Sequence, residues 1–403
     1  MQNFLYATYH RLISSLDFST HRYLFRDFHI NNRLTGLIGP RGVGKTTLIL
    51  QYIKENLYSD TQAFYFSADN IYFNKTSLLE FINTCYYTDG IRIFFIDEIH
   101  KYPDWSQTLK NIYDAFPDVK VIFSGSSSLD IVKGSADLSR RAKLFYLHGL
   151  SFREYLNFKT GSQIQITKWE NLIENSNDLG KQLTSINKII GHFKDYLQIG
   201  YYPFLFEDPH SYNEKIARII EKTIYEDIAN YFSLKTSNLY LFKNILNYLA
   251  SIPPGLINTH SIAKHLGIDD KTAFHYLTIL KETGLVRFIQ PYAKEKQLLS
   301  KPEKIFLNNT TLHTTINSFL GASNEIGTQR ELFFLQSIMN AGIHVFTNDY
   351  VDFQVNDCLF EIGDKNKTSH QINKTNLPAF LVKDDILIGN KNTIPLLYFG
   401  FLY

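Results

Sequence analysis

Apolar residues in the first third of the chain follow two kinds of pattern. Short apolar or β-branched runs are typical of strands that are buried on both faces. Between these runs, apolar residues recur every three or four positions, which is the spacing of an amphipathic helix. The predicted strands are 34–38, 63–66, 91–96 and 119–123, and the main predicted helices are 46–58 and 105–116. Strands that alternate with helices predict an α/β fold with a parallel, doubly wound sheet.

The pattern changes beyond residue 160, where a polar, Asn-rich stretch is followed by long helices. Ile216, Ile220 and Ile224 share one helical face, so a helical subdomain is predicted here rather than more sheet. A Pro-Pro-Gly cluster at 253–255 marks the next break in the pattern. The last hundred residues again favour strands.

The junction between the first predicted strand and its helix reads GPRGVGKT and matches G-x-x-x-x-G-K-[ST] in full. Glycines let backbone N–H groups curl around phosphate oxygens, and the helix N-terminus adds positive potential. Lys45 is expected to reach the β- and γ-phosphates of ATP, and the Thr46 hydroxyl is expected to ligate Mg²⁺. The predicted nucleotide-binding residues are Gly39, Pro40, Arg41, Gly42, Val43, Gly44, Lys45, Thr46 and Thr47.

Two carboxylates end the apolar run at 93–96, and each has a predicted role in ATP hydrolysis. Asp97 is expected to lie beside the Mg²⁺ that Thr46 binds. Glu98 is expected to act as the general base for a water aimed at the γ-phosphate. An ATPase needs such a glutamate, whereas a kinase that acts on a small hydroxyl does not.

Hydroxyl and guanidinium groups further along the chain are weaker candidates for the same site. The strand at 119–123 runs into a serine-rich turn, in which Ser126, and after it Ser124, is expected to sense the γ-phosphate. Arg140 or Arg141 is a candidate arginine finger, acting on a neighbouring subunit's nucleotide or on its own. A plain serine-rich turn and a solvated basic pair are the alternatives.

Composition narrows the class of protein. The chain has 403 residues, which allows two to four domains, and 41 basic against 39 acidic residues, so it is not a polyanion-coating protein. The two cysteines, Cys85 and Cys358, lie far apart, which excludes a disulfide scaffold and a cysteine zinc site. No apolar run reaches about 18 residues, and the N-terminus lacks the layout of a signal peptide. These features predict a cytoplasmic protein without membrane contact.

Taken together, these motifs resemble a widespread prokaryotic group of AAA+ ATPases. Members carry GxRGVGKTT, a DEI stretch before Pro-x-Trp, a T/SGSS turn, an Arg-Ala step and a Leu-Ser-Phe-x-Glu element. This chain reads GPRGVGKTT, DEIHKYPDW, SGSSS, RRA and LSFREYL, followed by GYYPF at 200–204. A helicase is the less favoured alternative, because DEIH resembles a helicase box but the sequence has no second RecA-like domain.

The resemblance implies a modular plan beyond the ATPase core. The group carries a winged helix and a restriction-nuclease-like module in its C-terminal half. The expected domains are an AAA+ P-loop core over 1–160, a helical lid over 161–235, a winged helix over 236–298 and a nuclease-like α/β domain over 299–403.

Residues 259–290 have the pattern of a helix-turn-helix followed by a strand. Ala273, Leu277 and Leu280 are expected to face the core of this module. The residues expected to face outward are Lys271, His275, Thr278 and Lys281. Outward basic residues favour contact with DNA, but Asp269 and Asp270 at the helix start repel phosphate. Protein contact therefore remains an alternative.

The final hundred residues contain the outline of a PD-(D/E)xK nuclease site. Glu331 lies on a predicted helix, Asp352 opens a strand and Glu361 ends the next strand, and such carboxylates hold Mg²⁺ for phosphodiester hydrolysis. Gly363 occupies the position of the expected lysine, with Lys365 two residues further on. The sequence therefore favours a nuclease-like fold with a degenerate site, and scattered surface acids are the alternative.

Two functions remain open at this point. The first is a DNA-associated AAA+ ATPase that uses ATP and Mg²⁺. The second is a nucleotide-driven regulatory switch whose C-terminal modules bind a protein partner. A homo-oligomer is compatible with both.

Overall fold

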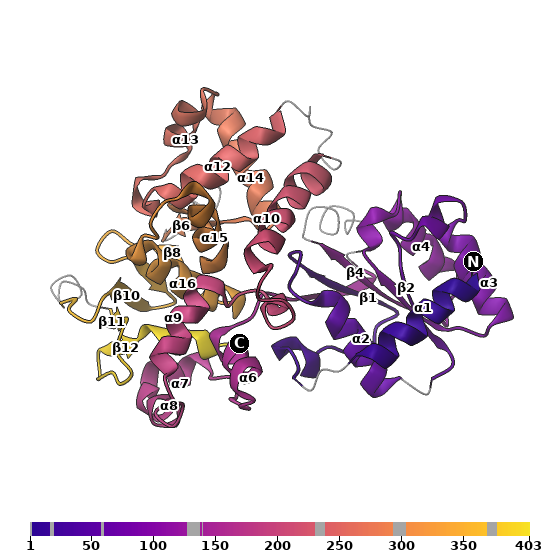
Figure 1. Cartoon of the computed structure of the whole chain (residues 1–403), viewed down its shortest axis with the longest axis horizontal. Helices are drawn as coiled ribbons and strands as arrows, with labels where there is room; N and C mark the ends of the chain where they lie inside the picture. Colours follow the sequence, from indigo (N-terminus) through magenta and orange to yellow (C-terminus); the bar gives the residue numbers. More distant parts are fainter. Residues whose placement is uncertain are drawn as a thin grey trace. The chain divides into compact units, whose positions relative to one another are not determined.

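A computed structural model of the chain describes residues 2–16, 20–57, 60–126, 138, 140–229, 238–292, 304–368 and 377–403. The chain forms two compact units, residues 1–149 and residues 150–403. Figure 1 shows the first unit in indigo to purple and the second in magenta to yellow.

The first unit is built on a parallel sheet of five strands in the order β2-β3-β4-β1-β5. Its strands are β1 (Leu34–Gly39), β2 (Ala63–Ser67), β3 (Ile93–Asp97), β4 (Lys120–Ser126) and β5 (Ala142–Tyr146). Its helices are α1 (Gln2–Ser15), α2 (Lys45–Asn56), α3 (Leu78–Thr88) and α4 (Trp105–Ala115), with 3₁₀ turns η1 (Tyr23–Arg26), η2 (Ile71–Asn74) and η3 (Ile99–Lys101). The predicted α/β fold and its four strands are confirmed.

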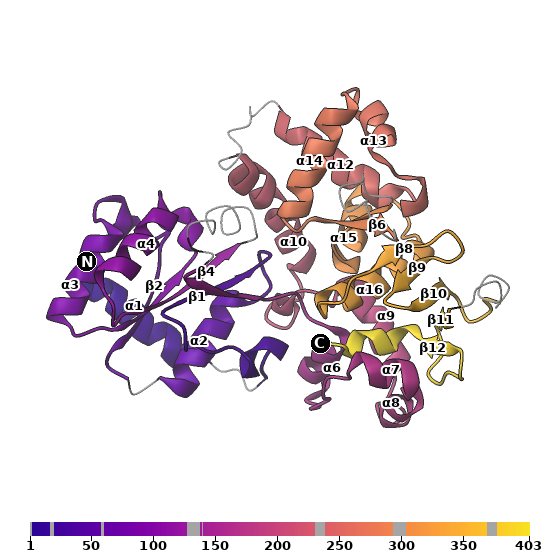
Figure 2. The ribbon, with the colours of Figure 1, turned by 180° about the vertical axis from the view of Figure 1, so that it is seen from behind.

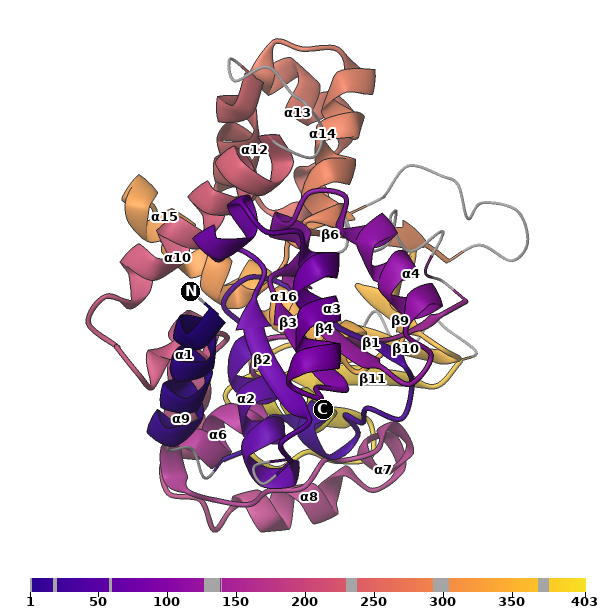
Figure 3. The ribbon, with the colours of Figure 1, turned by 90° about the vertical axis from the view of Figure 1, so that its right-hand side faces the viewer.

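Helices cover both faces of this sheet, as parallel strands require. Right-handed crossovers place α2 on one face and α3 and α4 on the other. Helix α1 packs beside α2, and α3 packs beside α4 (Figure 3). Phe94, Phe95 and Ile96 in β3 are fully buried, which explains why that strand is apolar along its whole length.

Strand register brings three functional segments to one edge of the sheet. Gly39 at the end of β1 lies opposite Ser126 in β4, and Ile96 in β3 lies opposite Phe123 in β4. Asp97 follows at the same end of β3. Ligands of such sheets bind at the carboxyl ends of the strands, so this edge is where a site is expected.

The second unit opens with helices. They are α6 (Phe152–Thr160), α7 (Trp169–Glu174), α8 (Ser176–Leu183), α9 (Ile189–Ile199), α10 (Tyr212–Lys222), α12 (Leu239–Ser251), α13 (Thr259–Leu266) and α14 (Asp270–Glu282). Shorter turns are the 3₁₀ segments η4 (Pro203–Leu205) and η7 (Pro254–Leu256) and the π-helical segment η5 (Thr223–Ile228). The LSFREYL element is the start of α6, where Ser151 and Glu154 form a reciprocal capping box.

A mixed sheet of seven strands completes the second unit, in the order β12-β11-β10-β9-β8-β6-β7. The strands are β6 (Val286–Pro291), β7 (Lys304–Leu307), β8 (Phe346–Thr347), β9 (Phe353–Val355), β10 (Cys358–Gly363), β11 (Ala379–Lys383) and β12 (Thr393–Pro395). Helix α15 (Thr310–Leu320) contacts β7, while α16 (Ile326–Asn340) contacts β10 and the C-terminal 3₁₀ turn η9 (Leu396–Phe401) (Figure 2).

Strand pairing crosses one of the predicted domain boundaries. Strand β6 pairs antiparallel with β7 and parallel with β8, so strands on both sides of the predicted boundary in the sequence belong to one continuous sheet. The helix pair α13–α14 and strands β6 and β7 follow the order expected of a helix-turn-helix with a wing. Within the described residues, no helix combines the length and apolar character that a membrane crossing requires.

Candidate active site at the β3 edge

The loop between β1 and α2 has the backbone shape of a phosphate cradle. Gly42 and Gly44 have φ angles of 79° and 93°, a left-handed region that favours glycine. A Cβ on Gly39 would lie 2.2 Å from the carbonyl oxygen of Leu147, so only glycine fits there. Lys45 Nζ donates to the carbonyl oxygens of Gly39 and Pro40, at 2.9 and 3.0 Å. The lysine ammonium is therefore held over the loop that precedes it.

Asp97 is surrounded by hydroxyl groups from three elements. Thr46 Oγ1 donates to Asp97 Oδ2 at 2.6 Å, and the Tyr65 hydroxyl donates to the same oxygen at 3.0 Å. Ser124 Oγ donates to Asp97 Oδ1. Burial, followed by the charge of Asp97, raises the pKa of Tyr65, so its phenol remains a donor.

Glu98 has an unusual backbone conformation immediately after β3. Its φ of 51° lies in the left-handed region, which is costly for a residue other than glycine and is often found at functional sites. Its N–H donates to Ser124 Oγ at 3.1 Å, and its Oε2 lies 3.3 Å from Nε2 of the nearly buried His100. The carboxylate of Glu98 therefore contacts His100 in this structure.

The donor set suits Mg²⁺. The Thr46 hydroxyl and the Asp97 carboxylate are already in contact, and both are oxygen ligands of the kind that Mg²⁺ prefers. Within the residues that the structure describes, no three histidine, cysteine or acidic side chains group as metal ligands. A magnesium ion at Thr46 and Asp97 would therefore take its other ligands from water and phosphate oxygens, as Mg²⁺ usually does.

Six residues make up the candidate active site, which we call the Asp97 site. They are Lys45, Thr46, Tyr65, Asp97, Glu98 and Ser124. Sequence reasoning named all of these except Tyr65, and it missed His100, although both lie within or next to recognised segments. Ser126 lies beside Gly39 in the strand register, and its side chain is outside the described residues. Thr47 lies in the first turn of α2.

Arg140 and Arg141 do not join this group. Arg141 precedes β5, whose first residue pairs with Leu34 at the start of β1, whereas the phosphate loop follows the end of β1. At about 3.3 Å per residue, the length of β1 puts roughly 16 Å between the two edges. Arg141 instead lies 3.7 Å from Asp114 at the end of α4, and Arg140 is exposed.

The acidic residues predicted for a nuclease site lie in the second unit, and lysines pair with two of the three. Lys367 Nζ lies 2.5 Å from Glu361 Oε1, and Lys304 Nζ lies 3.3 Å from Glu331 Oε2. Asp352 Oδ2 accepts from the N–H of Ile362 at 2.8 Å. The ion pair with Glu361 therefore comes from Lys367 and not from Lys365. We call Lys304, Glu331, Asp352, Glu361 and Lys367 the Glu361 cluster.

Burial dominates the electrostatics of the Glu361 cluster. It raises the pKa of Glu331 and of Glu361, and the charge of Asp352 raises both further. Burial lowers the pKa of Lys367, but the hydrogen bond that it donates to Glu361, together with the charges of Glu361, Asp352 and Glu331, outweighs burial and raises the lysine pKa. A Cβ on Gly363 would lie 2.6 Å from Lys367 Cβ, so glycine makes room for the lysine that neutralises Glu361.

Helix α14 places its residues as the sequence predicted. Ala273, Leu277 and Leu280 are fully buried. Lys271, His275 and Lys281 are exposed, and Thr278 is half-buried with its hydroxyl donating to the Phe274 carbonyl. Asp269 caps the helix by accepting from the Thr272 N–H at 2.9 Å, and Asp270 lies 3.1 Å from His260.

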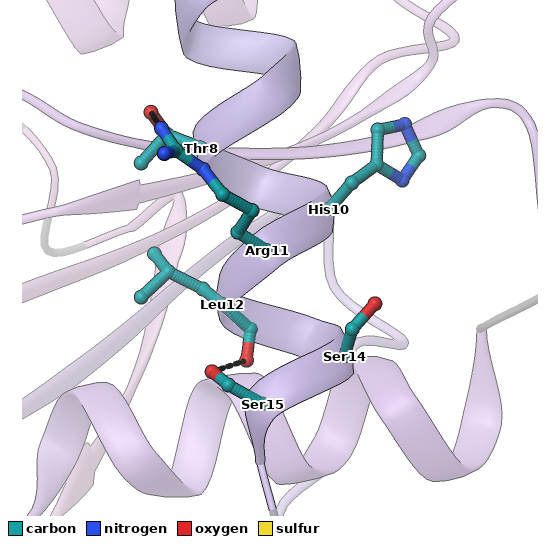
Figure 4. Close-up of a pocket in the computed structure, with 6 residues that line it drawn as sticks. All are labelled: Thr8, His10, Arg11, Leu12, Ser14 and Ser15. Carbon is teal, nitrogen blue, oxygen red and sulfur yellow. Dashed lines mark hydrogen bonds between the residues drawn. The ribbon is translucent and has the colours of Figure 1, made fainter.

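A hollow on the outer face of α1 is not a comparable site. Figure 4 shows that the side chains lining it fan out from successive turns of one helix. They are Thr8, His10, Arg11, Leu12, Ser14 and Ser15. Among the residues that the structure describes, no second element lines the hollow with a converging polar group, so it has no built binding geometry.

Family comparison agrees with the geometry of the β3 edge. Residues 31–156 match the family described as an AAA domain. This match contains the phosphate loop, Asp97 and Glu98, and it ends within α6. A second match, over residues 190–324, is to a domain of unknown function, DUF8612. That segment runs through both boundaries of the predicted winged helix.

One curated relative aligns with much of this chain. An uncharacterized protein of Methanocaldococcus jannaschii, MJ1637, is 30% identical over 283 residues, covering 67% of this chain and 59% of the relative. The alignment thus spans less than two thirds of that protein.

Two solved structures show weak likeness. The Hsp104–ADP complex of S. cerevisiae is 17% identical with a TM-score of 0.33, covering 67% of this chain and 41% of that one. AMPPCP-bound DnaA from Aquifex aeolicus is 14% identical with a TM-score of 0.27, covering 70% of this chain and 87% of that one. Structural similarity this low supports no conclusion about function.

Proposed function

We propose that this chain binds ATP and hydrolyses it with Mg²⁺ at the Asp97 site of its AAA domain. The contact between the Thr46 hydroxyl and Asp97, at 2.6 Å, is the observation that carries the proposal. It joins the helix that follows the phosphate loop to the end of β3. Glu98 then lies one residue beyond the proposed metal ligand, where a hydrolytic base is needed.

Four residues of the site have distinct parts in this reaction. Mg²⁺, held by Thr46 and Asp97, would supply positive charge to the phosphate oxygens. Lys45 would leave the loop carbonyls for the β- and γ-phosphates. Glu98 would accept a proton from the water that attacks the γ-phosphorus. The bond from that phosphorus to the β–γ bridging oxygen breaks, and ADP and phosphate leave.

The position of Arg141 favours a role as an arginine finger for the nucleotide of a neighbouring subunit. It lies at the sheet edge opposite its own phosphate loop, so Arg141 or Arg140 would serve the nucleotide of a neighbouring copy in a homo-oligomer. Mixing Arg141→Ala with Lys45→Ala protein should restore part of the ATPase activity that each variant lacks alone. Mixtures that stay as inactive as the single variants would contradict this assignment.

We further propose that α13, α14, β6 and β7 act as a winged helix that associates with DNA. Exposed Lys271, His275 and Lys281 on α14 support this hypothesis. The two aspartates at the start of α14 favour the alternative, a regulatory switch whose C-terminal modules bind a protein partner. DNA association predicts binding that weakens steeply with salt, because bound phosphates release counterions.

The Glu361 cluster supports a nuclease-like fold with a degenerate site rather than an active nuclease. Its residues do not fit a metal ion as they stand, because Lys367 and Lys304 already neutralise Glu361 and Glu331. We therefore derive no phosphodiester cleavage from it.

ATP turnover with and without duplex DNA tests the proposed function. Wild-type protein should release phosphate, and Lys45→Ala should abolish that release. DNA-stimulated turnover supports the DNA hypothesis, and turnover indifferent to DNA supports the protein-partner switch. A wild type without any turnover would contradict the proposed ATPase activity itself.

A further inference from the structure

Arg22 contacts the phosphate loop, although it belongs to none of the recognised sequence motifs. It directly precedes η1, and only 5% of its surface is exposed. Its guanidinium makes two bonds to backbone carbonyls of this unit. Nη1 donates to the carbonyl of Val43 in the loop, and Nη2 donates to the carbonyl of His148 at 2.7 Å.

The segment around Arg22 is fixed on several sides. The Tyr23 hydroxyl donates to the Tyr146 carbonyl at 2.8 Å and accepts from the His148 N–H at 3.3 Å. Gln51, on the helix that follows the loop, donates to the Thr20 carbonyl at 3.3 Å. Arg22 is therefore a short, anchored bridge from the end of β5 to the loop and not a mobile surface side chain.

The bond to the Val43 carbonyl also fixes the direction of the Gly44 N–H, which belongs to the same peptide. A trans peptide is planar, so its C=O and the following N–H point in opposite directions. With the Val43 carbonyl fixed toward Arg22, the Gly44 N–H must point away from Arg22. Gly44, which follows this peptide bond, and Gly42, which precedes Val43, both have left-handed φ angles, and a glycine backbone can leave such a conformation easily.

We propose that Arg22 is a positioning residue for nucleotide binding: it locks the Val43–Gly44 peptide so that the Gly44 N–H faces the phosphates. This inference rests on the proposed ATPase function and deepens it. A guanidinium suits the task because its fork reaches two carbonyls at once and always remains charged. Its positive charge also adds to the potential of the loop.

Arg33 provides a matched control within the same unit. Its Nη2 also donates to two backbone carbonyls, those of Tyr113 and Phe116, at 2.5 and 2.9 Å. Arg33 directly precedes β1, however, so it acts at the edge of the sheet opposite the phosphate loop. Arg22→Met and Arg33→Met remove equivalent bonds, and only the first change touches the loop.

The test is a titration of each full-length variant with a fluorescent ATP analogue in Mg²⁺, alongside thermal unfolding and steady-state kinetics. We expect Arg22→Met to weaken nucleotide binding about tenfold or more, the loss typical of a charged hydrogen bond. Its KM for ATP should rise more than its kcat falls. Arg22→Lys, which reaches one carbonyl, should bind with intermediate strength. Arg33→Met should bind within about twofold of wild type despite a similar fall in melting temperature.

Equal nucleotide affinity in wild type and Arg22→Met would overturn the inference, and so would an equal loss in Arg33→Met. If Arg22→Met does not fold, Arg22→Lys decides between the same outcomes. A wild type that fails to bind the analogue would contradict the proposed function instead, so the two failures are distinguishable.

Discussion

Two sheets of this molecule each carry carboxylates at or near strand ends, and the two sets have different partners. In the Asp97 site, the carboxylate is held by the hydroxyls of Thr46, Tyr65 and Ser124. In the Glu361 cluster, ammonium groups of Lys304 and Lys367 pair with the carboxylates of Glu331 and Glu361. A hydroxyl can turn its lone pair toward a metal ion, whereas an ammonium group takes the place of one.

The comparison shows that an acidic residue at the end of a strand does not define a metal site by itself. The groups that face it decide what it can do. Hydroxyl partners leave room for Mg²⁺ and phosphate oxygens, while lysine partners complete the charge balance within the protein. Three predictions test this difference, and they are given from the largest expected effect to the smallest.

The largest effect is expected from Asp97→Asn, which would remove the charged ligand proposed for Mg²⁺. ATP turnover should fall about 100-fold or more, because the metal stabilises charge in the transition state by several kcal/mol. Steady-state phosphate release measures this effect. Asp118→Asn serves as the control, because Asp118 is an exposed carboxylate paired with Arg92. Turnover in Asp97→Asn within a few-fold of wild type would show that Asp97 is not a metal ligand.

A smaller effect is expected on stability when the ion pair of the Glu361 cluster is broken. Lys367→Met leaves the buried Glu361 without its cation and should cost about 2 kcal/mol, less than a fully buried pair because Lys367 is partly exposed. Urea unfolding of the full chain provides the measurement. The exposed Lys391→Met should have almost no effect.

Combining Lys367→Met with Glu361→Leu should recover much of that loss, because the double variant contains no unpaired charge. A double variant with the summed loss of the two single variants would show that the pair is not coupled.

The smallest effect concerns pH. The pKa of Glu331 is raised by burial, so the folded state holds its proton at pH values where the unfolded state has released it. Stability from this group is therefore lost as pH rises above the ordinary glutamate range. Glu331→Gln lacks this loss, so its stability relative to wild type should increase as pH rises above 4.5, the ordinary pKa of the group. A pH-independent difference between the two proteins would contradict the raised pKa.

Much of the first unit could be predicted from sequence because local rules govern it. The glycine loop needs its spacing to surround phosphate, and buried parallel strands must be apolar. Tyr65 was missed because its role comes from pairing between β2 and β3, which places its hydroxyl near Asp97. A tyrosine in an otherwise apolar strand near the active edge is the signal that could have indicated it.

The second unit was harder because its contacts depend on turns. Gly363 stands at the position of the lysine expected in a nuclease site and Lys365 lies two residues further on, but the strand ends at Gly363 and the chain turns there. The Lys367 N–H donates to the Asp364 carbonyl at 3.1 Å, and this turn returns Lys367 to Glu361. The pairing of β6 with β8 joins residues far apart in the sequence, and local sequence patterns carry no information on such a pairing.

The most direct test of the central claim compares Glu98→Gln with Glu361→Gln. Each protein would be incubated with Mg²⁺ and ATP, and the bound and released nucleotides would be separated and quantified. We predict that Glu98→Gln retains ATP but forms ADP at least about 100-fold more slowly, since it loses the general base. Glu361→Gln should turn over ATP within about twofold of wild type. Normal turnover in Glu98→Gln would contradict the assignment of hydrolysis to the Asp97 site.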